Sequence, residues 1–362
     1  MRGRADTSIT RSPDSETEEL DEVYLHTVSI HGREFHKFSI DNQIAFEPVD
    51  DEEAERLDLQ HRVFSRIFDG RLIFPPIPRL RRVLDCGYGT GSWAVDVATQ
   101  YPDSRVIGLD ISPHKNPDDV PENLWLQVGG DFQQSRDGRI AAGLRLDRAP
   151  GSVRLTSHHQ VDDLNRRFTF PSNHFDLVHS RLLATGINRA RWPSYLADIK
   201  RVLKPGGWVQ LVEIYFNVQS DNGSITEEHA LRRWSTQFLR SYEGTKDVRI
   251  GTRLNNLLRD RGFEDIDARM IPLPLSAWSN DPRMQAIGML NRENINNLLP
   301  SLALYPLTQI SGMPQQDFQK LITQAREEAE TASLKAYFPL IAALKLRRKE
   351  GRRIVLFLCF KS

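Results

Sequence analysis

The chain has 362 residues, 39% of them hydrophobic and 27% charged, which suits a soluble domain of about 200–250 residues with additional segments. Its 48 basic and 48 acidic residues cancel, which argues against a protein whose main task is to hold nucleic acid. No apolar run approaches the ~20 residues of a membrane helix, residues 1–20 carry no secretory signal, and Cys86 and Cys359 cannot build a disulfide framework or a four-ligand zinc site. We therefore expect an intracellular protein, cytoplasmic or alternatively nuclear, that needs no metal and binds neither nucleic acid nor membrane.

The first 79 residues are predicted to form a tail and an arm. Residues 1–22 contain no aromatic side chain and few aliphatic ones, so they are predicted to be a disordered tail. Between residues 23 and 40 the partial alternation around His31-Gly32 predicts a hairpin. Asp51–Asp69 has one apolar helical face and is followed by Gly70, a typical C-cap residue. The proline-rich stretch 73–78 ends this N-terminal cap arm, residues 23–79.

Strand and helix patterns alternate after the arm, which predicts an α/β fold with a parallel sheet covered on both faces. Strands are expected at Arg82–Asp85, Arg105–Asp110, Leu124–Val128, Phe175–His179, Trp208–Tyr215, Ile266–Leu275 and Arg353–Phe360. Helices are expected at Gly91–Gln100, Ser194–Leu203, Thr226–Tyr242, Thr252–Arg261, Gln315–Ala329 and Ser333–Lys349. The core is therefore predicted to combine residues 80–275 with 350–362, and residues 276–349 to be a helical insertion.

The segment Val83–Trp93 (VLDCGYGTGSW) is the motif that indicates function. A strand runs into three glycines at alternate positions and then into a helix. Gly87 and Gly89 let the chain turn at positive φ, which saves roughly 1–2 kcal/mol per residue. The helix N-terminus offers free N–H groups to a ligand. Asp110 ends the next strand, where a carboxylate can take both ribose hydroxyls of an adenosine-containing cofactor.

The loop departs from the dinucleotide-binding pattern, because G-x-G-x-x-G would need glycine where Ser92 stands. Asp85 precedes the loop, where its carboxylate would repel a pyrophosphate but could hold the ammonium of an amino-acid cofactor. These two features predict S-adenosylmethionine. A purely structural turn is the alternative, which the two acids disfavour.

The order strand, D-x-G-x-G-x-G, helix and acid-ended strand resembles a class I S-adenosylmethionine-dependent methyltransferase. Phe175–His179 and Leu203–Glu213 are similar to that family's fourth strand and to the glycine turn with its fifth strand. Four further stretches are similar to the fungal LaeA/UMTA-type methyltransferases of secondary metabolism: Phe35–Phe38, Asp50–His61, Trp192–Tyr195 and Glu213–Ser220. The resemblance implies a Rossmann-like fold with a mostly parallel seven-stranded sheet and S-adenosylmethionine as cofactor.

The resemblance also implies roles for individual residues. Asp85 would contact the methionine ammonium through the loop backbone or water, and Asp110 would bind the ribose. The acid after the third strand, Asp162, would accept from the adenine amino group, with Asp131 as the alternative. Three glycines would shape the pocket: Gly87, Gly89 and Gly91. Three residues at the end of the fourth strand would face the reactive end of the cofactor: His179, Ser180 and Arg181. The arm around Phe35–Phe38 would cover the cofactor.

Methyl transfer needs no metal, and alignment of the reactants alone can contribute ~7–11 kcal/mol. His179 and Glu213 are the candidate catalytic bases, because each stands at the carboxyl end of a predicted strand. A purely structural hydrogen bond is the competing interpretation of His179. The block 276–349 is the candidate substrate lid, although its aromatic residues would serve equally well to pack a hydrophobic core.

Three functions follow from these residues. The first is a methyltransferase acting on N or O of a small-molecule acceptor in secondary metabolism. The second is a LaeA-like regulator that binds the cofactor and acts through protein partners. The third, a nucleotide-dependent oxidoreductase, is disfavoured by Ser92 and by the Lys204–Gly207 turn before a fifth strand.

Residues 128–160 interrupt the family pattern. Joining Gln127 to Val161 restores LWLQVDDLNRRFTF, and the pair Gln-Val stands at both edges of the interruption. The segment contains one aromatic residue, Phe132, and little core-forming pattern. We interpret it as a disordered surface insertion, and its repeated edges suggest an intron retained in translation.

Overall fold

The computed structural model describes residues 17–18, 22–117, 119–128, 155–156 and 163–346. Most of the predicted tail and of the 128–160 insertion, both candidate adenine acids (Asp131 and Asp162) and the predicted strand Arg353–Phe360 lie outside these residues. Two short strands within them, β1 (Thr17–Glu18) and β7 (Leu155–Thr156), pair with each other in antiparallel fashion.

The centre of the protein is a sheet in which β10-β12-β9-β8-β4-β5-β6 are successive neighbours. β11 also pairs with β12, along the edge opposite to the one that β9 and β10 use. The parallel strands are β4 (Arg82–Cys86), β5 (Arg105–Asp110), β6 (Leu124–Val128), β8 (Phe175–Arg181) and β9 (Leu203–Ile214). The antiparallel ones are β10 (Gln219–Ser220), β11 (Glu264–Pro274) and β12 (Ala336–Leu346). The sheet has eight strands, and β10 pairs with the first residues of β12, beyond the part that pairs with β9. The predicted mostly parallel α/β fold is confirmed.

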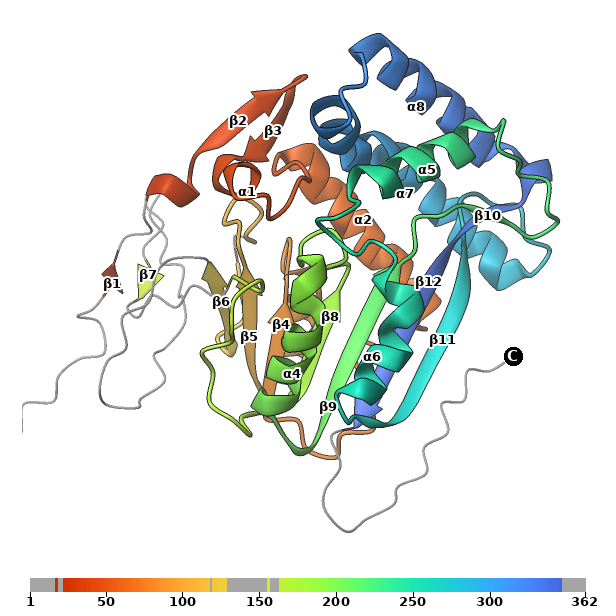
Figure 1. The fold of residues 1–362 in the computed structure, drawn as a ribbon. Coiled ribbons are helices and arrows are strands. Elements are labelled where there is room, and N and C mark those ends of the chain that lie inside the picture. The colour runs from red at the N-terminus through yellow and green to blue at the C-terminus, as the bar shows by residue number, and fades with distance from the viewer. Residues whose placement is uncertain (1–16, 19–21, 118, 129–154, 157–162, 347–362) are drawn as a thin grey trace, which may run out of the picture.

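Helices cover both faces of the sheet because successive strand residues point to opposite sides. Val83 packs with α3 (Ser92–Gln100), whereas its neighbour Leu84 packs with the opposite layer. That second layer contains α4 (Trp192–Val202) and α6 (Leu254–Asp260), which lie side by side in Figure 1. Three short 3₁₀ turns complete the described connections: η2 (Arg189–Arg191), η3 (Ile250–Arg253) and η5 (Ala332–Leu334).

The N-terminal cap arm folds over one end of the sheet, at the upper left of Figure 1. It contains η1 (Glu22–Tyr24), the hairpin of β2 (Thr27–Ile30) and β3 (Arg33–His36), α1 (Lys37–Asp41) and α2 (Asp51–Ile67). His31 and Gly32 turn the predicted hairpin at φ 50° and 82°. Asp50 caps α2 by accepting from the Glu53 N–H at 3.1 Å, and it also pairs with Arg33 at 2.7 Å. One carboxylate therefore fixes both the start of the helix and the hairpin.

A layer of helices beside the arm completes the same end of the molecule (Figure 1). Its members are α5 (Ala230–Ser241), α7 (Pro282–Tyr305), the π-helical turn η4 (Pro306–Ile310) and α8 (Gln315–Glu330). They share one hydrophobic core with α2 and with the end of β9. In the described part of the chain, no helix has the length and apolarity needed to cross a membrane.

The prediction of a helix at Ser333–Lys349 was wrong, because Ala336–Leu346 forms strand β12. Pro339 stands in the middle of this segment, where a helix would lose a hydrogen bond and clash. In the strand Pro339 lies opposite Pro272 of β11. The strand that returns to the sheet is therefore this segment, directly after α8 and η5, and the helical block ends at Leu334.

Candidate cofactor and active site

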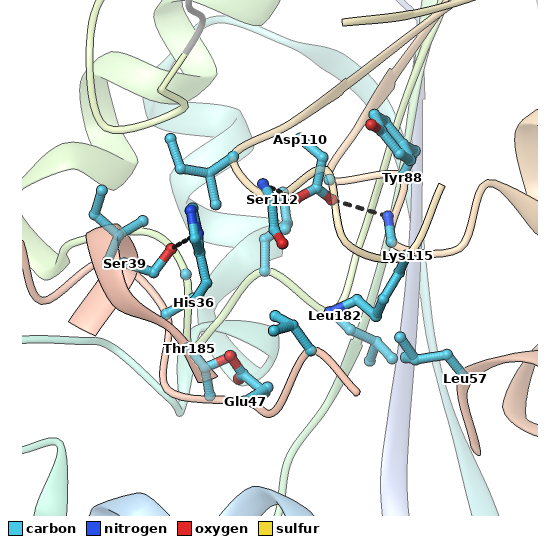
Figure 2. A pocket seen from close by; sticks show the side chains of 18 of the residues that line it. His36, Ser39, Glu47, Leu57, Tyr88, Asp110, Ser112, Lys115, Leu182 and Thr185 are labelled. Atoms are coloured by element: carbon cyan, nitrogen blue, oxygen red, sulfur yellow. Dashed lines mark hydrogen bonds between the residues drawn. The ribbon is translucent and has the colours of Figure 1, made fainter. Parts of the chain in front are cut away.

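One cavity lies between the carboxyl ends of β4, β5 and β8 and the cap arm. Gly87, Gly89 and Asp110 line it from the sheet side, as open α/β sheets place their ligands. His36 and Arg56 line it from the arm. In Figure 2 the arm residues His36, Ser39 and Glu47 lie across the cavity from Asp110 and Tyr88. The arm therefore lies across this cavity from the glycine loop, and its predicted role as a cover for the cofactor stays a prediction.

The glycine loop has the backbone conformation that the sequence predicted. Gly87 and Gly89 have φ of 72° and 61°. A Cβ on Gly87 would lie 2.4 Å from Cδ2 of Leu183, so a side chain there would collide with the neighbouring wall. Gly91 caps α3 at φ 78° but does not line the cavity. The glycines therefore divide between shaping the cavity and starting the helix.

Asp110 lies at the end of β5 and lines the cavity. One carboxylate oxygen accepts from the Gly89 N–H at 2.9 Å and the other from the Ser112 N–H at 3.1 Å. Burial raises the pKa of Asp110, while the charge of Lys115 and the backbone hydrogen bonds oppose that rise. Asp110 thus braces the glycine loop and also faces the space where a ribose would lie.

Asp85 lies under the glycine loop and does not line the cavity. Its side chain is buried, and burial raises its pKa to about 7; Arg181 opposes the rise and Asp110 adds to it. Asp85 is therefore separated from the cavity surface, and its predicted contact with the methionine ammonium through the loop backbone or water stays a prediction.

Arg181, the last residue of β8, lines the cavity. Its guanidinium lies over the Phe64 ring at 5.2 Å, and Nη1 is 3.3 Å from Nδ1 of His61. Nε2 of His61 is 2.8 Å from Asp96 on α3. His61 therefore links the arm to the core and holds this guanidinium in place.

The two predicted bases do not line the cavity. β8 runs two residues further than predicted, so His179 lies inside the strand, where its ring stacks on Trp93 at 3.8 Å. Its Nδ1 is 3.2 Å from Nε2 of Gln210, and burial lowers its pKa well below the usual value. Ser180 points away as well, towards the hydroxyl of Tyr195 at 3.0 Å. The placement of His179 at the reactive end of the cofactor is therefore corrected.

Glu213 near the end of β9 is buried behind the loop that follows β8. Its two carboxyl oxygens accept from the backbone N–H groups of Leu183 and Ala184 at 2.9 and 3.3 Å. Burial raises its pKa to about 8, although those two hydrogen bonds oppose the rise. The carboxyl group faces this loop and not the cavity.

Several residues that line the cavity were not singled out from the sequence. His36 bonds to Oγ of Ser39 at 2.7 Å (Figure 2), and burial lowers its pKa to about 4, so it is neutral near pH 7. Glu53 and Arg56 form a buried ion pair at 2.7 Å on α2. His36, Glu53 and Arg56 lie in the arm stretches FHKF and DDEEAERLDLQH, which resemble the family. The stretches do not show which of their side chains point into the cavity.

Asp163 is the described acid after the third parallel strand, and it lines the cavity together with Leu164 and Asn165. It follows Asp162 in the VDD stretch, and its Oδ1 accepts from the Asn165 N–H at 2.8 Å. The predicted region is therefore at the cavity, and the described acid there is Asp163.

Comparison with known proteins agrees with this geometry. Residues 59–268 match the family described as "Methyltransferase domain". The secondary metabolism regulator laeA of Monascus pilosus is 30% identical over 311 residues, which cover 85% of this chain and 74% of that protein. The protein-methionine methyltransferase laeA of Emericella nidulans is 28% identical, covering 85% and 73%. The methyltransferase pytC of Aspergillus terreus is 26% identical, covering 86% and 85%.

The glycine loop, the acid-ended β5, the strand order and these matches agree with one another. The chain therefore belongs to the class I S-adenosylmethionine-dependent methyltransferases, within the LaeA-like family.

Proposed function

We propose that this protein binds S-adenosylmethionine in the cavity between the glycine loop and the cap arm and methylates N or O of a small-molecule acceptor of secondary metabolism. The observation that carries the proposal is that Gly87, Gly89 and Asp110 share one cavity with the arm. A Cβ on Gly87 would collide with the Leu183 side chain, so glycine is needed where the loop packs against this wall of the cavity. These residues fit the methionine and ribose portions of the cofactor.

Each end of the cofactor has a candidate partner in this cavity. Asp110 would accept hydrogen bonds from the ribose hydroxyls, and Asp163, the acid next to Asp162, would face the adenine amino group. The guanidinium of Arg181 would pair with the methionine carboxylate, because it lines the cavity between the glycine loop and α2, where Arg56 is already paired with Glu53. Asp85 would act on the ammonium only indirectly.

The acceptor would lie beyond Leu182, where Leu57, Phe216 and Leu302 contribute apolar surface. The arm and the helical layer cover this part, which suits a compact acceptor better than a folded protein surface. The cofactor supplies the methyl group on a positively charged sulfur. The chain aligns the acceptor and excludes water, and alignment can contribute ~7–11 kcal/mol. We infer that His179 and Glu213 supply no base, because neither lines the cavity.

A methyl-transfer assay tests this proposal. Labelled S-adenosylmethionine would be incubated with the protein and a panel of amines, amides and phenols. Label should appear on members of the panel with the wild-type protein and be lost with Asp110→Ala. Binding of S-adenosylmethionine without label on any small acceptor would contradict the small-molecule acceptor.

The second candidate is a regulator that acts through protein partners, and it is favoured by the names of the laeA relatives. Its cofactor site would be the same. Label that appears on protein, and not on the small-molecule panel, would favour this function.

A further inference from the structure

The segment Leu182–Gly186, called here the 182–186 loop, connects β8 to the remainder of the cavity wall. Leu182, Leu183, Thr185 and Gly186 all line the cavity. The Leu183 side chain fills the space in which a Cβ on Gly87 would lie, so this loop packs directly on the glycine loop. A displacement of the 182–186 loop would therefore change the shape of the cofactor site.

The 182–186 loop starts in a conformation that must be held from outside. Leu182 has φ of 58°, in the left-handed region that residues with a branched side chain rarely adopt. The Leu182 N–H bonds to the Val212 carbonyl at 2.9 Å. The next two N–H groups, those of Leu183 and Ala184, have no strand partner and point to Glu213.

Glu213 holds the first half of the 182–186 loop with both of its carboxyl oxygens. The side chain is 2% exposed, and no basic side chain in the described ranges forms an ion pair with it. A buried carboxyl group without a countercharge is costly. Its hydrogen bonds to the loop are the compensation that the structure shows.

Lys246 holds the second half of the 182–186 loop. Its Nζ donates to the Gly186 carbonyl at 3.1 Å, to Oδ1 of Asn188 at 2.7 Å and to the Ile44 carbonyl at 3.0 Å. An ammonium has three N–H groups, so each has one acceptor. Ile44 belongs to the cap arm and lines the cavity. Lys246 therefore joins the loop to the arm at the edge of the cofactor site.

We propose that Glu213 and Lys246 are positioning residues that hold the 182–186 loop and the cap arm in the shape in which the cavity binds S-adenosylmethionine. Neither side chain touches the cofactor. This inference rests on the proposed function for the identity of the ligand. It replaces the role of base for Glu213 with a role in building the wall of the site.

The chain offers a matched control for each residue. Glu328 accepts from two successive backbone N–H groups, those of Ala230 and Leu231 at 2.9 and 2.8 Å, but it serves the start of α5. Lys200 donates to the Arg261 and Gly262 carbonyls at 2.8 and 2.9 Å, beside α6. Neither control residue lines the cavity. Glu328 repeats the two backbone hydrogen bonds of Glu213, and Lys200 repeats two of the three of Lys246. Both controls are half-buried and lie away from the cofactor site.

The experiment compares Glu213→Leu with Glu328→Leu and Lys246→Met with Lys200→Met. Affinity for S-adenosylhomocysteine is measured by calorimetry, and amide hydrogen exchange is followed in the ligand-free proteins. We expect an affinity loss of about tenfold or more in Glu213→Leu and Lys246→Met, because buried backbone groups lose their partners. The controls should stay within about twofold. Glu213→Gln retains a carbonyl for Leu183 and should recover most of the affinity.

Hydrogen exchange separates this inference from the proposed function. Faster exchange at Leu183 and Ala184 in Glu213→Leu, and at residues 186–188 in Lys246→Met, supports positioning whether or not the wild-type protein binds S-adenosylhomocysteine. If the wild-type protein does not bind it, the proposed function fails and the exchange result still decides the role of the two residues. Unchanged loop exchange, or equal affinity losses in test and control variants, would overturn the inference. If Glu213→Leu does not fold, Lys246→Met compared with Lys200→Met decides the same question.

Discussion

The two walls of the cavity are built in different ways. The sheet-side wall, taken here as the part at the ends of β4 and β5, comes from one stretch of chain, residues 87–112, and presents mainly backbone at the glycine loop. The arm-side wall consists of side chains and a loop that are held by residues far away in sequence: Ser301 bonds to Glu53, and Lys246 to Ile44. A wall made from contiguous backbone depends on few residues. A wall made across the fold depends on many small contacts, so single changes there should have smaller and more distributed effects.

The largest effect is expected on the sheet-side wall. Asp110→Ala removes both the ribose acceptor and the brace on the Gly89 N–H, so affinity for S-adenosylmethionine should fall about 100-fold, as measured by calorimetry. Asp103→Ala, an exposed acid just before the same strand, is the control and should change nothing. A loss of less than about threefold in Asp110→Ala would remove Asp110 from the cofactor site.

The pH dependence of stability tests the loop behind the arm-side wall. Folding raises the pKa of Glu213 from 4.5 to about 8, because the carboxyl group is buried. The folded protein therefore keeps a proton that the unfolded chain has lost, and this contribution to stability falls as pH rises through that window. The unfolding free energy of the wild-type protein minus that of Glu213→Gln should fall by about 3–4 kcal/mol from pH 5 to pH 8. A flat difference would show that Glu213 is ionised throughout.

A smaller loss of cofactor affinity is expected on substitution of Arg181, which lies where the arm meets the core. Arg181→Met should weaken S-adenosylmethionine binding about tenfold, because it removes the cation proposed to pair with the methionine carboxylate. Arg62→Met, at an exposed position on α2, is the matched control. If decarboxylated S-adenosylmethionine lost as much affinity as the intact cofactor on Arg181→Met, the carboxylate assignment would be incorrect.

The smallest effect on turnover is expected at His179. His179→Ala should leave the turnover number within about threefold of wild type, because the ring lies against Trp93 and outside the cavity. The same change should lower the melting temperature, since it leaves a hole beside Trp93. A fall in turnover of 100-fold or more with an unchanged melting temperature would restore His179 as the catalytic base.

The sequence was sufficient to predict the parallel strands, the glycine loop and the position of Asp110 at the end of β5, because each depends on a local pattern. Alternating strands and helices define the layers, and Gly87 and Gly89 are needed wherever the backbone turns at positive φ. The segment at Ala336–Leu346 was mistaken for a helix because a buried strand and a buried helix are both continuously apolar. Pro339 was the available signal against the helix.

The side-chain partners could not be predicted in the same way. His179 and Glu213 were chosen because they stand near strand ends, but direction alternates along a strand, and β8 proved two residues longer than expected. The bonds of Lys246 to Ile44 and of Ser301 to Glu53 cross 202 and 248 residues of sequence. No local pattern specifies such pairs, and so the arm-side wall became visible only in the structure.

The most direct test of the central claim, that arm and glycine loop form one cofactor site, is hydrogen exchange of the wild-type protein with and without S-adenosylhomocysteine. The account predicts protection on both walls: at residues 87–91 and 110–112, and also at residues 36–49 of the arm and in the 182–186 loop. Protection confined to residues around His179 and Trp93, or to the glycine loop with an unchanged arm, would contradict it.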